Sequence, residues 1–129
     1  VMRTGSQKYE AGTHNLLGIV GLVTAMELLL EIGVENIAGE LLRKRARLVP
    51  ALQARGCTVL HADAPPEAAS GIVSFSRPGS DLAVLHQKLT DAGVITSLRA
   101  DRTGQKYIRL SPHFYNTDAE LDRAVELVA

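Results

Sequence analysis

Residues 107–117 read YIRLSPHFYNT, and their alternation of apolar and polar side chains decides the fold. In a β-strand, successive side chains point to opposite faces of the sheet. The apolar face would comprise Ile108, Leu110, Pro112 and Phe114, and the polar face Tyr107, Arg109, Ser111 and His113. We therefore predict a strand over residues 107–114, with one face packed beneath helices and an arginine, a hydroxyl and an imidazole on the other.

Three further strands are predicted around this one. Residues 94–99 precede it, across a polar turn through residues 101–104 that has the length of a hairpin connection. Upstream, residues 58–62 and 71–77 are strand candidates. In the second of these, Val73 and Phe75 alternate with serines, which is the two-residue period of a half-buried strand.

Four segments have helical spacing of apolar residues. The longest apolar run, residues 16–32, is predicted to be an amphipathic to largely buried helix capped by Thr13 or Asn15. A second helix over residues 34–55 should kink at Pro50, because proline lacks a backbone donor. Ser80 is predicted to cap a third helix. The sequence TDAE at residues 117–120 is a capping box that opens the last helix.

This order of elements, α-α-β-β-α-β-β-α, predicts an α+β fold in two layers. We expect a small, mostly antiparallel sheet, covered on one face by helices and preceded by a long N-terminal helix. The polar residues 1–12 are interpreted as an extended lead-in, and residues 13–129 as one domain. A chain of 129 residues matches the usual size of a single domain.

Composition excludes several classes of function. Lys plus Arg and Asp plus Glu both number 14, so the chain lacks the basic excess of a nucleic-acid-binding domain. The basic run at residues 43–47 is accordingly interpreted as a solvated helix face. Because Glu27 and Glu31 lie within residues 16–32, we do not interpret this apolar run as a membrane span. We expect neither nucleic acid nor membrane as a partner.

Cysteine and histidine usage limits the other sites. The single cysteine, Cys57, excludes an internal disulfide framework and suits a reducing, cytoplasmic compartment. The four histidines lack metal-ligand spacing, and no cysteine or acidic cluster joins them. We therefore expect no metal site.

Two features could carry binding chemistry. On the strand before the hairpin turn, Ser97 and Arg99 follow Ile95 on one face, so Arg99 and Arg109 could together receive a carboxylate or phosphate. The alternative is a solvated face with scattered arginines. Gly12 and Thr13 precede the first long helix, where backbone donors favour anions. The alternative there is a simple helix cap.

Taken together, these features resemble a known family. The sequence YEAGT at residues 9–13, the helix ending in EIG at residues 31–33, and RLSPHFYN at residues 109–116 occur in the order found in the C-terminal domain of class V aminotransferases. These are fold-type I pyridoxal-phosphate enzymes related to cysteine desulfurases and isopenicillin N epimerase. The resemblance extends from about residue 9 to residue 128.

The resemblance implies a set of roles. The family forms homodimers with active sites at the subunit interface, so Gly12 and Thr13 would meet the phosphate of pyridoxal 5′-phosphate held by the partner subunit. Arg109 would bind the α-carboxylate of an amino-acid substrate, and Arg99 would make a second substrate contact. The neighbouring residues His113, Tyr115 and Asn116 would support Arg109 rather than take part in chemistry.

The chain departs from the family pattern in two ways, which limit the roles that the resemblance implies for it. Cysteine desulfurases carry a nucleophilic cysteine between the last two strands, but residues 100–106 contain none, and Cys57 is interpreted as a buried apolar residue. In addition, no lysine has the context of the Schiff-base lysine; the candidates are Lys8, Lys44, Lys88 and Lys106. We therefore expect no catalytic residue in this chain and no activity from it alone.

The chain is accordingly predicted to be the C-terminal small domain of an enzyme whose large, lysine-bearing domain is not in this sequence. The intact enzyme would carry out transamination, epimerisation or lyase chemistry on an amino acid. The alternative is a non-catalytic α+β module that binds an amino acid or regulates another protein. That alternative explains the missing lysine, but not the occurrence of both motifs in family order.

Overall fold

The computed structural model describes residues 4–9 and 12–129, which divide into two compact units. The first unit extends to Val34 and the second comprises Glu35–Ala129. Residues 10 and 11 of the YEAGT motif and residues 1–3 of the lead-in lie outside the described residues.

The first unit contains a 3-10 helix, η1 (Gly5–Tyr9), and the helix α1 (Leu16–Ile32). Because of η1, the described part of the lead-in is not extended as predicted. Asn15 rather than Thr13 caps α1, since its side-chain oxygen accepts a hydrogen bond from the Gly18 amide. No residue of α1 is buried, so the predicted burial of this helix does not occur within the described chain.

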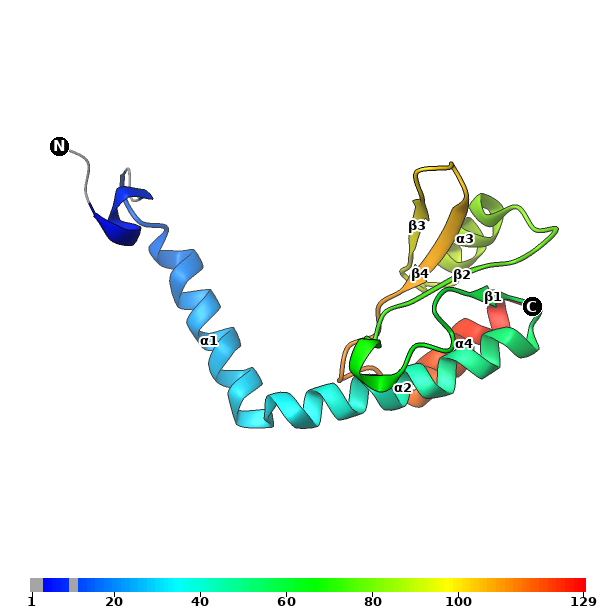
Figure 1. Ribbon diagram of the computed structural model, residues 1–129, viewed down its shortest axis with the longest axis horizontal. Coiled ribbons are helices and arrows are strands. Elements are labelled where there is room, and N and C mark those ends of the chain that lie inside the picture. Colours follow the sequence, from blue (N-terminus) through cyan, green and yellow to red (C-terminus); the bar gives the residue numbers. More distant parts are fainter. Residues whose placement is uncertain (1–3, 10–11) are drawn as a thin grey trace. The chain divides into compact units, whose positions relative to one another are not determined.

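The second unit is the predicted α+β domain (Figure 1). Its helices are α2 (Val34–Ala54), α3 (Leu82–Asp91) and α4 (Asp118–Leu127), with a short 3-10 helix, η2 (Pro66–Ala68). The strands are β1 (Thr58–Val59), β2 (Val73–Ser76), β3 (Ser97–Ala100) and β4 (Lys106–Leu110). The fold class predicted from the sequence is confirmed.

The four strands form one antiparallel sheet in the order β1-β2-β4-β3. The alternating strand residues Val73, Phe75 and Ile108 are fully buried. They pack with Leu48 and Leu52 of α2, Leu89 of α3 and Val125 of α4 in one hydrophobic core. The helices therefore cover one face of the sheet, and the polar strand residues lie on the opposite face.

Several boundaries differ from the prediction. The β4 strand ends at Leu110 rather than residue 114, and β3 begins at Ser97, which leaves Ile95 outside the sheet and 93% exposed. Helix α3 is capped by Asp81 rather than Ser80, because the Asp81 carboxylate accepts from the Ala83 amide at 2.8 Å. The capping box of Thr117 and Glu120 on α4 is confirmed.

Candidate functional site

The polar face of the sheet presents Arg109 at its centre. Arg109 lies on β4 between the buried residues Ile108 and Leu110, so its side chain points away from the core. The register places Ser74 of β2 and Ser97 of β3 directly opposite it on its two sides. Directly opposed residues of an antiparallel pair share a face, so Arg109 is flanked by two small hydroxyl residues.

The guanidinium of Arg109 lacks a partner within the described part of the chain. Its Nε atom is buried and makes no hydrogen bond. Buried donors are almost always satisfied in folded proteins, and a charged donor left without an acceptor is costly. The residues directly opposite it, Ser74 and Ser97, have small side chains. This combination is what a receptor for a carboxylate or phosphate requires.

Arg99 lies on the same face, on the edge strand β3. It is two residues from Ser97 and directly opposite Tyr107, so Arg99 and Arg109 are diagonal neighbours across the β3–β4 pair. Arg99 is exposed. The structure therefore brings together the two arginines that the sequence predicts to form one receptor.

The turn between β3 and β4 is built around Asp101. Its Oδ1 atom accepts from the amide and hydroxyl of Thr103 at 2.8 and 2.7 Å and from the Gln105 amide at 3.1 Å. Its Oδ2 atom lies 3.4 Å from the Tyr107 hydroxyl. The Thr103 hydroxyl, followed by these other donors, lowers the pKa of Asp101, whereas desolvation and the nearby Asp101 charge raise the pKa of Tyr107. The Asp101 charge is thus engaged in holding the turn.

Beyond Leu110 the chain leaves the sheet, so Ser111 and His113 do not continue the polar row as predicted. Asn116 closes a turn here. Its side-chain Oδ1 accepts from the backbone amide of His113 at 2.8 Å, and its backbone amide donates to the His113 carbonyl at 3.1 Å. The His113 ring stacks on Tyr115 with 4.4 Å between centroids. The His113 Nδ1 atom is buried without a hydrogen-bond partner among the described residues. These residues shape the turn, and whether they support Arg109 stays a prediction.

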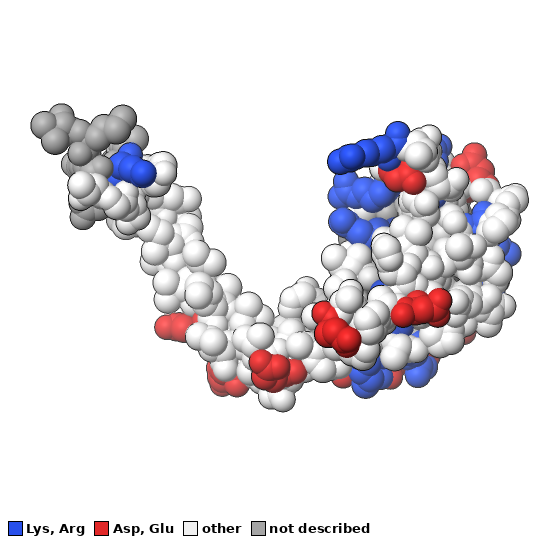
Figure 2. Space-filling model, viewed as in Figure 1, with Lys and Arg blue, Asp and Glu red and all other residues white. Residues whose placement is uncertain are grey.

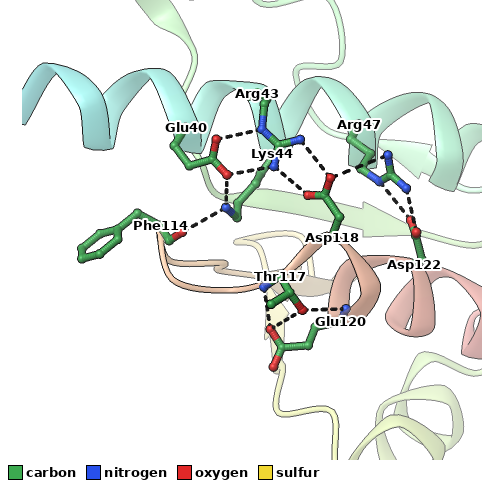
Figure 3. A network of polar contacts seen from close by, with 9 residues as sticks. All are labelled: Glu40, Arg43, Lys44, Arg47, Phe114, Thr117, Asp118, Glu120 and Asp122. Atoms are coloured by element: carbon green, nitrogen blue, oxygen red, sulfur yellow. Dashed lines mark hydrogen bonds and ion pairs between the residues drawn. The ribbon is translucent and has the colours of Figure 1, made fainter.

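A network of ion pairs fastens this turn and α4 to α2 (Figure 3). Arg43 donates to Glu40 at 2.7 Å and to Asp118 at 2.6 Å, and Arg47 donates to Asp122 at 2.6 Å. Lys44, only 1% exposed, donates to the Phe114 carbonyl at 3.0 Å and also pairs with Glu40. The network therefore holds the segment that directly follows the Arg109 strand.

The interpretation of residues 43–47 as a solvated face is therefore wrong for two of its cations. Arg45 is 8% exposed and donates to the carbonyls of Ile72, at 3.1 Å, and His61. Lys44 is buried as described above. Sequence reasoning missed this cluster, although a signal was present: Arg43 and Arg47 are four residues apart, as are their partners Asp118 and Asp122.

Gly12 and Thr13 lie in the first unit, immediately before α1, and both are exposed. The Thr13 hydroxyl makes no hydrogen bond with the described residues, because Asn15 takes over the capping of the helix. A Cβ atom at Gly12 would meet nothing within 4 Å. An open backbone, an unengaged hydroxyl and a helix N-terminus together fit a phosphate group.

The single thiol is not placed for nucleophilic chemistry. Cys57 is 6% exposed and belongs to the hydrophobic core, and this burial raises the pKa of its thiol. A thiolate, not a thiol, is the reactive form. The interpretation of Cys57 as a buried apolar residue is confirmed.

Three of the four lysines have a partner among the described residues, and the fourth, Lys106, lines a hollow with Gly79 and Asp81. Lys44 is paired as above, and Lys88 donates to the carbonyl of Ala129 at 3.2 Å. Lys8 lies over the Tyr9 ring, 4.9 Å from its centroid, and Lys106 is exposed at the start of β4.

No group of three or more His, Cys, Asp or Glu side chains in residues 4–9 and 12–129 is arranged to hold a metal ion. In the same ranges, no single helix is long and apolar enough to cross a membrane; α1 and α2 satisfy the length and composition criteria only as a broken pair.

The profile of the family described as Aminotransferase class-V matches residues 1–124. The chain belongs to this family, whose members are pyridoxal-phosphate enzymes. It is 32% identical, over 143 aligned residues, to a probable cysteine desulfurase of Xylella fastidiosa strain 9a5c, and 31% identical to that of strain Temecula1. Each alignment covers 97% of this chain and 32% of the relative, so the chain spans about a third of these relatives' length.

Solved structures agree with this assignment. A protein described as NifS-like matches 99% of the chain with a TM-score of 0.77 and 29% identity, and the match covers 37% of that protein. The Escherichia coli cysteine desulfurase CsdA in its S-sulfonic acid form shares the fold at a TM-score of 0.80 and 23% identity. Its match covers 98% of this chain and 33% of the other chain.

Proposed function

We propose that this chain is the small domain of a pyridoxal-phosphate enzyme of class V that acts on an amino acid, with Arg109 as the receptor for the α-carboxylate. The single observation that carries the proposal is the Arg109 guanidinium, whose buried Nε has no partner among the described residues. Family membership supports the cofactor. The proposal concerns a protein about three times the length of this chain.

The residues of this chain would bind and orient rather than react. Arg109 would form two parallel hydrogen bonds with the α-carboxylate, which fixes the direction of the bonds at the α-carbon. The flanking Ser74 and Ser97 would leave that face open. The Asn116 turn and the Lys44–Phe114 contact would hold the end of β4, so that Arg109 keeps its position. Bound pyridoxal phosphate would supply the electron sink for transamination, epimerisation or lyase chemistry.

Gly12 and Thr13 would contact the cofactor's phosphate in a homodimer, each subunit serving the site of its partner. The unengaged Thr13 hydroxyl and the open space at Gly12 support this role. The Schiff-base lysine would come from outside this chain. We propose a cytoplasmic enzyme whose reaction proceeds without a persulfide on Cys57, because that thiol is buried and its pKa is raised.

The proposal is tested by Arg109→Ala in the full-length protein that contains this chain. We expect the dissociation constant for the amino-acid substrate to rise by about 10- to 100-fold, since a charged hydrogen-bonding partner of about 1.5–3 kcal/mol is lost. The absorbance of the bound cofactor should stay normal, and Arg109→Lys should recover only part of the affinity, because an ammonium lacks the planar fork.

Arg55→Ala is the matched control, because Arg55 is exposed and makes no side-chain contact with the described residues. Unchanged amino-acid affinity in Arg109→Ala would remove Arg109 from the site. A full-length protein that binds amino acids but no pyridoxal phosphate would favour the non-catalytic binding module instead.

A further inference from the structure

The cationic side chains of the described residues fall into two groups. Most have an acceptor: Arg43, Lys44 and Arg47 pair with acids, and Arg45, Arg77, Lys88 and Arg123 donate to carbonyls. Within residues 4–9 and 12–129, five cations have neither an acceptor nor an aromatic ring. Four of the five lie on the β3–β4 hairpin: Arg99, Arg102, Lys106 and Arg109.

This distribution is not explained by composition, because acids and bases are equal in number over the whole chain. Acids near α2 neutralise Arg43, Lys44 and Arg47 of that helix. The one acid within the hairpin, Asp101, instead accepts from the Thr103 and Gln105 donors of its own turn. Figure 2 shows the resulting accumulation of blue side chains along the β3–β4 hairpin. An unneutralised cationic surface of this kind attracts anions.

Only two of the four cations share the receptor face. Arg99 aligns with Ser97, Tyr107 and Arg109, whereas Lys106 pairs with Ala100 on the alternate position and so points to the other face. Arg99 and Arg109 are diagonal neighbours, and residues in such pairs lie about 7–8 Å apart, with a somewhat shorter distance between their Cβ atoms. Two long side chains from such neighbouring positions on one face are close enough for one small ligand to contact both.

We propose that the Arg99 position receives a second anionic group of the substrate, so that the substrate class is amino acids with an anionic side chain, a carboxylate or a phosphate. This inference rests on the proposed function, in which Arg109 holds the α-carboxylate. The exposed Arg99 guanidinium has no acceptor among the described residues, so it is available to an anionic group of a bound ligand.

The experiment measures dissociation constants by calorimetry on the full-length protein with three ligands: alanine, glutamate and O-phosphoserine. We expect glutamate or O-phosphoserine to bind more tightly than alanine. Whichever of the two binds more tightly shows whether the second anionic group is a carboxylate or a phosphate. Arg99→Gln should reduce the affinity for that ligand by about two- to fivefold, the range of an exposed ion pair, and should reduce the affinity for alanine by a smaller factor. Arg99→Lys should retain much of the preference for the anionic ligand over alanine.

Lys106→Gln is the matched control, since it removes one charge from the same hairpin on the opposite face. A preference for the anionic ligands that persists in Arg99→Gln, or that Lys106→Gln weakens equally, would overturn the inference. So would equal affinity for all three ligands in the unaltered protein. In each of these cases Arg109→Ala should still weaken alanine binding; if it does not, the proposed function itself fails.

Discussion

At the scale of single residues, Glu40 is a carboxylate whose pKa its neighbours lower strongly. It accepts from Arg43 at 2.7 Å and also pairs with the buried Lys44. The hydrogen bond from Arg43, followed by that from Lys44, lowers the pKa of Glu40 from 4.5 to about 2. A carboxyl whose pKa is lowered on folding adds stability above its ordinary pKa, and this contribution disappears as pH falls towards the folded value.

We therefore predict that Glu40→Gln changes the acid limb of the stability curve. The variant should unfold at lower urea concentration than the unaltered chain at pH 6, and the difference should shrink as pH falls from about 4.5 to about 2. The measurement is the urea midpoint by circular dichroism across this range.

Glu35→Gln provides the comparison, because Glu35 lies on the same helix and is exposed. The difference in urea midpoint between Glu35→Gln and the unaltered chain should change less over this pH range than the difference for Glu40→Gln. A pH-independent difference for Glu40→Gln would contradict the assignment of the low pKa to Glu40.

At the scale of elements, the caps show which local signals are decisive. Ser80 and Asp81 are adjacent, and both are good N-cap residues, so the sequence alone does not distinguish them. The structure selects Asp81, because Ser80 already belongs to the turn closed by its amide and the Arg77 carbonyl at 3.2 Å. Only the Asp81 carboxylate reaches the Ala83 amide.

This choice predicts unequal costs for two neighbouring substitutions. Asp81→Ala should destabilise the domain by about 1 kcal/mol, because an N-terminal amide of α3 loses its acceptor. Ser80→Ala should change the free energy of unfolding by less than about 0.5 kcal/mol. Thermal and urea unfolding of both variants measures this difference. Equal costs, or a larger cost at Ser80, would show that the cap is misassigned.

Helices were more predictable than strands for a physical reason. The core positions of α2, α3 and α4 repeat at helical spacing, which is a local signal. The strands β1 and β2 are shorter than predicted, since the carbonyls of His61 and Ile72 beside them are taken by the Arg45 side chain. His61 also has a φ of 52°, outside the strand region. A side chain 16 residues away is not visible in strand periodicity.

At the scale of the whole molecule, the candidate site was predictable in part. Alternation along β3 and β4 placed Arg99 and Arg109 on one face, and the observed register of Ser97 with Arg109 confirms it. The unpartnered Nε of Arg109 could not be predicted, because it depends on the absence of acids from all neighbouring strands. The same holds for the buried Lys44, whose acceptor Phe114 is 70 residues away.

The apolar side chains of helix α1 have no cover among the described residues. Leu17 is 85% exposed, Leu22 60% and Leu30 67%, and these residues lie on different sides of the helix. A helix that is apolar all round is buried in a stable protein. Under the proposed function, residues outside this chain or a second subunit would cover it.

We predict that the 129-residue chain self-associates through α1 when it is produced alone. Replacing Leu17, Leu22 and Leu30 together by lysine should shift it towards monomer, because charged side chains cannot be buried without partners. Sedimentation velocity at several concentrations measures the shift. The unfolding midpoint of the second unit should stay unchanged, since none of its core residues is altered.

Val84→Lys is the comparison for this change, because Val84 on α3 is 67% exposed yet lies outside α1. It should leave association unaltered, since a single exposed apolar side chain is ordinary on a soluble surface. A chain that is monomeric before any substitution would mean that α1 needs no cover. Association that persists in the triple variant would place the contact on the second unit, where the open face of Arg99 and Arg109 would then have to be examined as an interface.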